Sequence, residues 1–98
     1  MTTREKAVLK ISDEVVALIR KMHPHIKANI KLALNHIAKD PYCGKSLKSE
    51  LNGLKSYRVK RYRIIYRIGK KGIIEIIAIG PRKYIYEDTF QIINKKQK

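Results

Sequence analysis

The residues with the greatest potential for chemistry lie in the second half of the chain, between Lys55 and Tyr86. Lysines, arginines and tyrosines are frequent there, and no acidic residue occurs between Glu50 and Glu75. Guanidinium groups bind phosphate oxygens in pairs, and a tyrosine can stack on a base or exchange a proton. This combination of residue types predicts a surface that binds a phosphodiester.

Three arginines are the strongest candidates for a phosphate site. If Lys60 and Arg61 form a two-residue turn, Arg58 lies directly opposite Arg63 on one face of a hairpin. Like charges opposite each other destabilise a strand pair, and a shared anion would offset that repulsion. Arg82, which follows the next strand, can then reach the same anion. Two points stay open: Lys-Arg is not a preferred turn sequence, and the cations could simply solvate an exposed sheet face.

Tyr84 and Tyr86 follow Arg82 closely, and either could supply a stacking ring or a phenol for proton transfer. The simpler alternative is a ring packed on the protein with its hydroxyl in water. Strand cleavage by attack of a 2′-hydroxyl on the adjacent phosphate needs a proton acceptor, a proton donor and positive charge near the phosphorane. Arginines supply the charge, and a tyrosine among cations could act as the acceptor.

Other catalytic designs have little support. No glycine-rich phosphate loop, metal-ligand spacing or Ser-His-Asp order is visible, so we predict no cofactor and no metal. His23 and His25 flank Pro24, and His36 is far in sequence from the basic residues, so a catalytic histidine is the weaker alternative. Cys43 is the single cysteine; it cannot form an internal disulfide, and we expect an unreactive thiol.

Composition favours a polyanionic partner. The 98 residues carry a formal net charge of +15, which lowers the free energy of any complex with a polyanion. Nucleic acid is the first candidate, and an acidic protein is the second. The length suits one domain, residues 1–98, and no apolar run is long enough for a signal peptide or a membrane span. We therefore expect a cytoplasmic protein.

The elements that must position these side chains follow from hydrophobic periodicity. Residues 7–11 alternate as a short strand, and helical spacing begins after Ser12 or Asp13, either of which could cap the helix. Pro24 then suits the first turn of a second helix, which ends near Asp40. The apolar stripe of this second helix consists of Ile26, Ile30, Ala33, Leu34 and Ile37.

Beyond a polar loop at residues 42–53, the period changes to two. An antiparallel meander of three strands is expected at residues 57–59, 62–68 and 73–79. One face of its first hairpin should contact the helices, through Tyr57, Val59, Tyr62, Ile64, Tyr66 and Ile68. Arg58, Arg63 and Arg67 then face the other side.

Residues 87–96 could form a third helix, with Glu87 and Asp88 at its positive end. The predicted fold class is therefore α+β. A helical hairpin packs on a small, mainly antiparallel sheet in the order β-α-α-β-β-β, followed by a possible C-terminal helix.

Two segments carry a resemblance to a known family. Residues 54–68, LKSYRVKRYRIIYRI, and residues 77–86, IAIGPRKYIY, resemble the hairpin and the later segment of the RelE/ParE superfamily of toxins. The similarity covers most of the chain and is densest at residues 51–86. It implies a RelE-like fold and a toxin of a type II toxin–antitoxin system.

The resemblance to the RelE branch implies a metal-independent endoribonuclease that cleaves messenger RNA in the ribosomal decoding site. It assigns Arg58 and Arg63 to the basic positions of the hairpin and Arg82 to the arginine after the last strand. Tyr86 matches a late tyrosine, and Tyr84 competes with it because the spacing varies in the family. These assignments make Arg58, Arg63, Arg82 and Tyr86 the candidate catalytic group. The wider candidate RNA-binding set is Lys55, Lys60, Arg61, Arg67, Lys83 and Tyr84.

Two other functions stay open. ParE-type members share the fold but poison DNA gyrase without nuclease chemistry, and a degenerate member could bind nucleic acid without cutting it. For any toxin, the resemblance implies a cognate antitoxin whose acidic or amphipathic segment wraps the basic surface. The RelE branch adds messenger RNA on the ribosome as a partner.

Overall fold

The computed structural model describes residues 7–96, which form three α-helices and a five-stranded sheet. The strands are β1 (Val8–Ile11), β2 (Lys45–Ser46), β3 (Lys55–Val59), β4 (Tyr62–Ile68) and β5 (Ile73–Pro81). The helices are α1 (Asp13–Lys21), α2 (Pro24–Lys39) and α3 (Arg82–Lys96), with short 3₁₀ turns at Pro41–Cys43, Ser49–Leu51 and Lys70–Gly72. Within this described part of the chain, no helix is long and apolar enough to cross a membrane.

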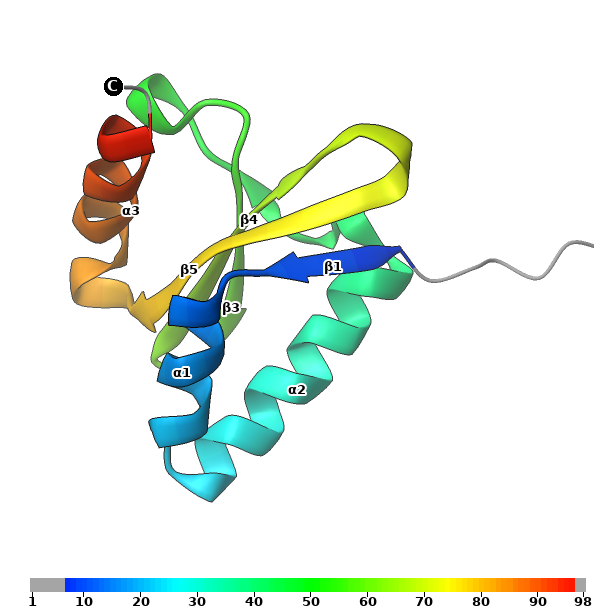
Figure 1. The fold of residues 1–98 in the computed structure, drawn as a ribbon, viewed down its shortest axis with the longest axis vertical. Helices are drawn as coiled ribbons and strands as arrows, with labels where there is room; N and C mark the ends of the chain where they lie inside the picture. Colours follow the sequence, from blue (N-terminus) through cyan, green and yellow to red (C-terminus); the bar gives the residue numbers. More distant parts are fainter. Residues whose placement is uncertain (1–6, 97–98) are drawn as a thin grey trace, which may run out of the picture.

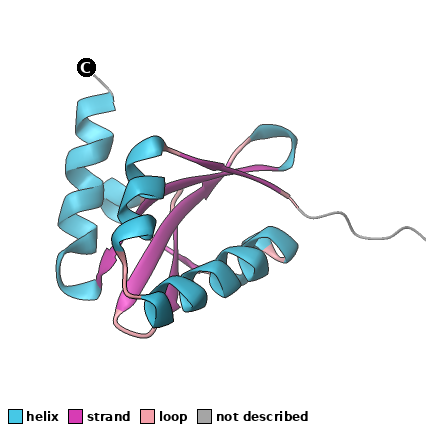
Figure 2. Ribbon diagram, turned by 60° about the horizontal axis from the view of Figure 1, so that its bottom comes forward, coloured by secondary structure: helices cyan, strands magenta, loops and turns pink. Residues whose placement is uncertain are grey.

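The strands form one mixed sheet in the order β1-β5-β4-β3-β2. β1 runs parallel to β5, and every other pair of neighbours is antiparallel. Figure 1 shows α2 on one side of the strands and α3 on the other. Figure 2 shows α1 and α2 as consecutive helices joined by a short turn. The predicted α+β class, with a helical hairpin on a mainly antiparallel sheet, is confirmed.

The helical hairpin forms one layer because its apolar stripes face the same side of the sheet. Ser12 caps α1 by accepting a hydrogen bond from the Val15 amide at 3.2 Å. The His23 side chain caps α2, and a proline occupies the first position of this helix, where a missing N–H is tolerated. Ile30 and Ile37 are fully buried against the sheet, as their helical spacing predicts.

The Tyr66 side chain of β4 packs in the same core as Ile30 and Ile37 and is fully buried. Its hydroxyl donates to the Pro41 carbonyl at 2.8 Å and accepts from the Gly44 amide at 2.9 Å. Burial raises the pKa of Tyr66 well above its usual value. A Cβ added at Gly44 would collide with this hydroxyl, so the segment after α2 packs directly on β4.

A second apolar cluster lies on the opposite face of the sheet, beneath α3. Ile65 and Ile85 are fully buried in it, and the Thr89 hydroxyl donates to the Ile85 carbonyl at 2.7 Å. On β4 and β5, Ile65 pairs with Ala78 and Tyr66 pairs with Ile76, so Ile77 is an extra residue in β5. This β-bulge lets both Ile77 and Ala78 face the cluster. The central strands are therefore buried on both faces.

Two expectations from the sequence are wrong. α3 begins at Arg82 rather than at residue 87, so its first turn is basic instead of acidic. Burial of Ile85 and Thr89 against the sheet outweighs the unfavourable charge at this end of the helix dipole. Residues 42–53, predicted as a loop, contain β2, which pairs with the start of β3. α3 also covers part of the sheet face that carries the arginines.

Candidate nucleic-acid interface

The β3–β4 turn aligns two arginines, as the alternation predicts. Val59 pairs with Tyr62 across the two-residue turn, and this register places Arg58 opposite Arg63. Lys60 has a φ of 57°, in the left-handed region that glycine or asparagine usually occupies. The Arg58 Nε donates to the Lys60 carbonyl at 3.4 Å, which holds the guanidinium beside the turn. The predicted register is confirmed, although a lysine must adopt a strained backbone to reach it.

The end of β5 brings a third arginine to the same place. Gly80 lies opposite Arg63, and the Arg82 amide donates to the Arg61 carbonyl at 2.9 Å. A cavity of about 560 Å³ opens between the turn and the start of α3. We call it the basic cavity, because its charged lining residues are all cations, namely Arg58, Lys60, Arg61, Arg82 and Lys83.

Arg63 occupies a more enclosed position, next to Arg58 on the neighbouring strand. It is half-buried, and among residues 7–94, whose side chains the structure describes, its Nε is the one buried side-chain nitrogen or oxygen without a hydrogen-bond partner. A buried donor without an acceptor costs about 1–3 kcal/mol. An anion bound here would supply the missing acceptor and would offset the repulsion between the two guanidinium groups.

The two candidate tyrosines lie on different sides of α3. Tyr86 is one turn after Arg82, and its hydroxyl oxygen lies 3.4 Å from that of Ser56, on the arginine face of β3. Tyr84 is 55% exposed, and its ring centre lies 5.4 Å from the Lys83 Nζ. Tyr86 also lines a cavity of about 360 Å³ with Glu50, Leu51, Glu87 and Phe90. Of the two tyrosines, it is Tyr86 that packs toward the arginine-bearing sheet face.

Two residues of the candidate RNA-binding set lie at the far end of the hairpin, away from the basic cavity. Arg67 forms an ion pair with Glu75, with 2.7 Å from Nη2 to Oε1, and its Nε donates to the same oxygen at 3.0 Å. Lys55 donates to the Ser46 hydroxyl at 2.9 Å, and its Nζ lies 5.5 Å from the centre of the Tyr42 ring. Both cations are therefore already engaged within the protein.

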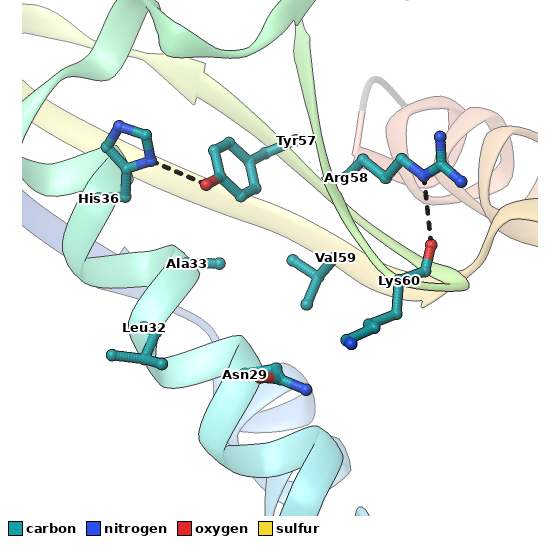
Figure 3. A pocket seen from close by; sticks show the side chains of 8 residues that line it. All are labelled: Asn29, Leu32, Ala33, His36, Tyr57, Arg58, Val59 and Lys60. Carbon is teal, nitrogen blue, oxygen red and sulfur yellow. Dashed lines mark hydrogen bonds between the residues drawn. The ribbon is translucent and has the colours of Figure 1, made fainter.

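A contact between α2 and β3 had no counterpart in the sequence patterns. The His36 Nδ1 lies 2.8 Å from the Tyr57 hydroxyl oxygen, and the two rings meet edge to face with their centres 5.5 Å apart. Figure 3 shows both side chains bordering a cavity of about 400 Å³ between the helix and the strand. The two residues are 21 positions apart, on elements with different periods, so no local signal could have paired them.

The described residues give little support for a metal site or for a nucleophilic cysteine. Among the residues that the structure describes, no three His, Cys, Asp or Glu side chains gather closely enough to hold a metal ion. Cys43 is a free, half-buried thiol, and burial raises its pKa. A raised pKa disfavours the thiolate, which is the nucleophilic form.

Comparison with known proteins identifies the family. Residues 5–86 match the family model described as the ParE toxin of type II toxin–antitoxin systems. The match spans most of the chain, which therefore belongs to the ParE toxin family within the RelE/ParE superfamily. The protein is a toxin of a type II toxin–antitoxin system, and the superfamily expected from its two signature segments is confirmed. No curated protein sequence matches the chain.

Solved toxin structures share the fold. A chain of the RelBE2 toxin–antitoxin complex from Mycobacterium tuberculosis is 26% identical, with a TM-score of 0.68 over 79% of this chain and 99% of that chain. A mutant of E. coli RelE in the free state is 15% identical, with a TM-score of 0.74 over 93% and 97% of the two chains. The RelE–RelB complex from Pyrococcus horikoshii gives 20% identity and a TM-score of 0.65, over 79% and 96%. These three structures are of RelE or of RelE-type toxin–antitoxin complexes, whereas the matching family model is that of ParE.

Proposed function

We propose that this toxin is a ribosome-dependent endoribonuclease, which inhibits translation by cleaving messenger RNA. The observation that carries the proposal is that Arg58 and Arg82 line one cavity at the turn, with Arg63 opposite Arg58 on the neighbouring strand. No ion pair engages these three arginines in the described part of the chain. Three such cations can bind one phosphate and stabilise the negative charge that develops on it during cleavage.

In the proposed reaction, the 2′-hydroxyl of one nucleotide attacks the adjacent phosphorus while its proton passes to a base. The bond from phosphorus to the 5′-oxygen breaks, and that oxygen takes up a proton, leaving a 2′,3′-cyclic phosphate. Arg58 and Arg82 bind the phosphoryl oxygens, and the unpartnered Nε of Arg63 donates to one of them. Tyr86, one turn from Arg82, acts as the proton acceptor or as a platform for a base.

The strand on either side of the scissile phosphate would lie across the other cations of the candidate set. Lys60, Arg61 and Lys83 line the basic cavity and would bind the flanking phosphates. Lys55, Arg67 and Tyr84 would then contact the strand only farther from the reacting phosphate. We also propose that residues 1–98 form a single toxin domain that acts in the cytoplasm.

A cognate antitoxin is the proposed protein partner. The Mycobacterium tuberculosis and Pyrococcus horikoshii relatives were solved as toxin–antitoxin complexes. The net charge of +15 and the exposed cations of the basic cavity favour a partner with an acidic segment. Such a segment would compete with RNA for the same cations.

The second candidate function is inhibition of DNA gyrase without nuclease chemistry. It is favoured by one observation, the match to the ParE family model. In that case the basic cavity would contact gyrase or its DNA, and Tyr86 would have no role in proton transfer.

Induced expression in cells that lack the antitoxin separates the two functions. Messenger RNA 5′ ends and plasmid supercoiling are followed together for the wild type, Arg82→Ala and the control Arg20→Ala, which removes an exposed cation from the last turn of α1. We expect codon-phased cuts with the wild type and the control, none with Arg82→Ala, and normal supercoiling. Intact transcripts with lost supercoiling would instead assign the ParE activity.

A further inference from the structure

We propose that the groove between α2 and the end of β3 is a subsite for one nucleobase of the RNA strand. This inference rests on the proposed function, because it concerns the strand whose phosphate lies in the basic cavity. Figure 3 shows the groove, with Ala33 and His36 on the helix facing Tyr57 and Val59 on the strand. Asn29 and Leu32 also line it. Its volume is about 400 Å³.

The walls of the groove have the chemistry that a nucleobase needs. Leu32 is 67% exposed, and together with Val59 and the half-exposed Tyr57 ring it offers an apolar surface to a flat heterocycle. The Asn29 amide and the His36 imidazole add donors and acceptors that can reach the polar edge of a base. The groove therefore offers a planar ligand both apolar surface and several polar groups.

The Tyr57 ring is held in place before any ligand arrives. Its hydroxyl is 2.8 Å from the His36 Nδ1, and the imidazole meets the phenol ring edge to face. A ring that is already fixed loses little side-chain entropy when a base stacks on it. The histidine therefore acts as a positioning residue for the tyrosine.

The groove and the basic cavity are neighbours at the β3–β4 turn. Arg58 and Lys60 line both of them. β2 pairs only with Lys55 and Ser56 of β3, so beyond that point the strand has an open edge in the described sheet. An RNA strand can cross this edge with a phosphate at the turn and its base in the groove, where the charged neighbours, Arg58 and Lys60, are both cations.

Binding of a short single-stranded RNA to the full chain tests the subsite directly. The probe is a fluorescein-labelled 2′-O-methyl hexanucleotide, which lacks the nucleophile for cleavage, and affinity is measured by fluorescence anisotropy over a range of salt concentrations. We expect Tyr57→Ala to weaken binding about 5- to 100-fold with an unchanged salt slope, because stacking and not charge is lost. Tyr57→Phe should keep most of the affinity.

A matched pair of variants at exposed leucines tests the groove even if Tyr57→Ala fails to fold. Leu32→Glu places a carboxylate at the mouth of the groove, and Leu18→Glu places the same charge on α1, where the leucine is 42% exposed and lines neither the groove nor the basic cavity. Leu32→Glu should weaken binding more than tenfold relative to Leu18→Glu. An abasic nucleotide in the probe should weaken wild-type binding but cause no further loss in Tyr57→Ala.

The outcomes separate this inference from the proposed function. Equal affinities of the wild type, Tyr57→Ala and Leu32→Glu, with codon-phased cuts still present in cells, would overturn the subsite and leave the nuclease intact. An absence of RNA binding by the wild type, together with intact transcripts, would overturn both. If the groove variants weakened only the complex with the antitoxin, the groove would be a protein-docking site and not a base subsite.

Discussion

The two ends of the β3–β4 hairpin carry the same residue types, but their charges are handled differently. At the far end, Arg67 is neutralised by Glu75 on the neighbouring strand. At the turn end, no ion pair engages Arg58 or Arg63 within residues 7–96. An uncompensated cluster of cations destabilises a fold unless something outside it supplies the opposite charge. The comparison supports the proposal that the turn end binds an anion, whereas the far end is neutralised within the fold.

β5 creates this difference, because it supplies the residue that faces each arginine of β4. Glu75 lies opposite Arg67, whereas Gly80 lies opposite Arg63. A glycine offers no side chain to neutralise the guanidinium, and the Ile85 side chain of α3 packs against it. The same sheet face therefore carries an ion pair at one end and uncompensated arginines at the other.

The largest expected difference between the two ends concerns catalysis. Arg58→Gln removes a cation from the basic cavity and should slow messenger RNA cleavage about 100- to 1,000-fold, as expected when one preorganised donor to a transition state is lost. Arg67→Gln, the matched change at the far end, should slow it less than about tenfold. Initial cleavage rates on programmed ribosomes measure both, and similar losses would remove the distinction between the two ends.

Tyr66 should contribute to the stability of the fold and not to catalysis. Tyr66→Phe leaves the Pro41 carbonyl and the Gly44 amide without their partner, so the free energy of unfolding should fall by about 1–3 kcal/mol. Urea unfolding measures this change, and Tyr84→Phe, at an exposed position, is the control with little expected effect. A cleavage rate per folded Tyr66→Phe molecule far below that of the wild type would contradict a purely structural role.

The stability of the protein at alkaline pH should depend on the same buried hydroxyl. The pKa of Tyr66 is raised in the folded state by burial, so the folded protein retains a proton that the unfolded chain releases. Its contribution to stability is complete below about pH 10, the ordinary pKa of tyrosine, and is lost as pH rises above it. Between pH 9 and 11, wild-type unfolding free energy should fall more steeply than that of Tyr66→Phe, by up to about 1.4 kcal/mol per pH unit. Parallel curves would contradict the shift.

The strained turn predicts a smaller, opposite effect on stability. Lys60→Gly should raise the free energy of unfolding by about 1 kcal/mol relative to Lys60→Ala, because glycine adopts the positive φ without steric cost. Both variants lose the same cation, so their RNA affinities should fall together. Equal denaturation midpoints would show that the turn carries no strain.

The ion pair at the far end should contribute least. Its two side chains are 51% and 28% exposed, and exposed pairs contribute about 0–1 kcal/mol. A double-mutant cycle of Arg67→Ala and Glu75→Ala should give a coupling energy in this range that shrinks as salt is added. A coupling well above 1 kcal/mol would mean that the pair is a major stabilising element.

Local patterns predicted the elements whose signals lie close together in the chain. The helical hairpin is marked by the cap at Ser12 and by the buried stripe that contains Ile30 and Ile37. The hairpin register follows from strict alternation and a two-residue turn, which place Arg58 opposite Arg63. These features depend on residues a few positions apart, so sequence alone carries them.

Tertiary packing set the features that the sequence patterns missed. The start of α3 at Arg82 depends on burial of Ile85 against a distant strand, which overrides the charge pattern of the helix. The contact between His36 and Tyr57 joins a helix to a strand. The hydrophobic periodicity of either element does not predict which residue of the other element it contacts. The separation of Tyr86 from Tyr84 likewise follows from the docked helix.

The sequence by itself determined which side chains are charged and on which face of its strand each arginine lies, because alternation along a strand is a local geometric rule. Only the tertiary structure decided which of these charges stay uncompensated. Pairing of β4 with β5 placed Glu75 opposite Arg67 and Gly80 opposite Arg63, and the end of β5 brought Arg82 to the turn. Such long-range pairing depends on how whole elements bury their apolar faces, which no short-range period contains.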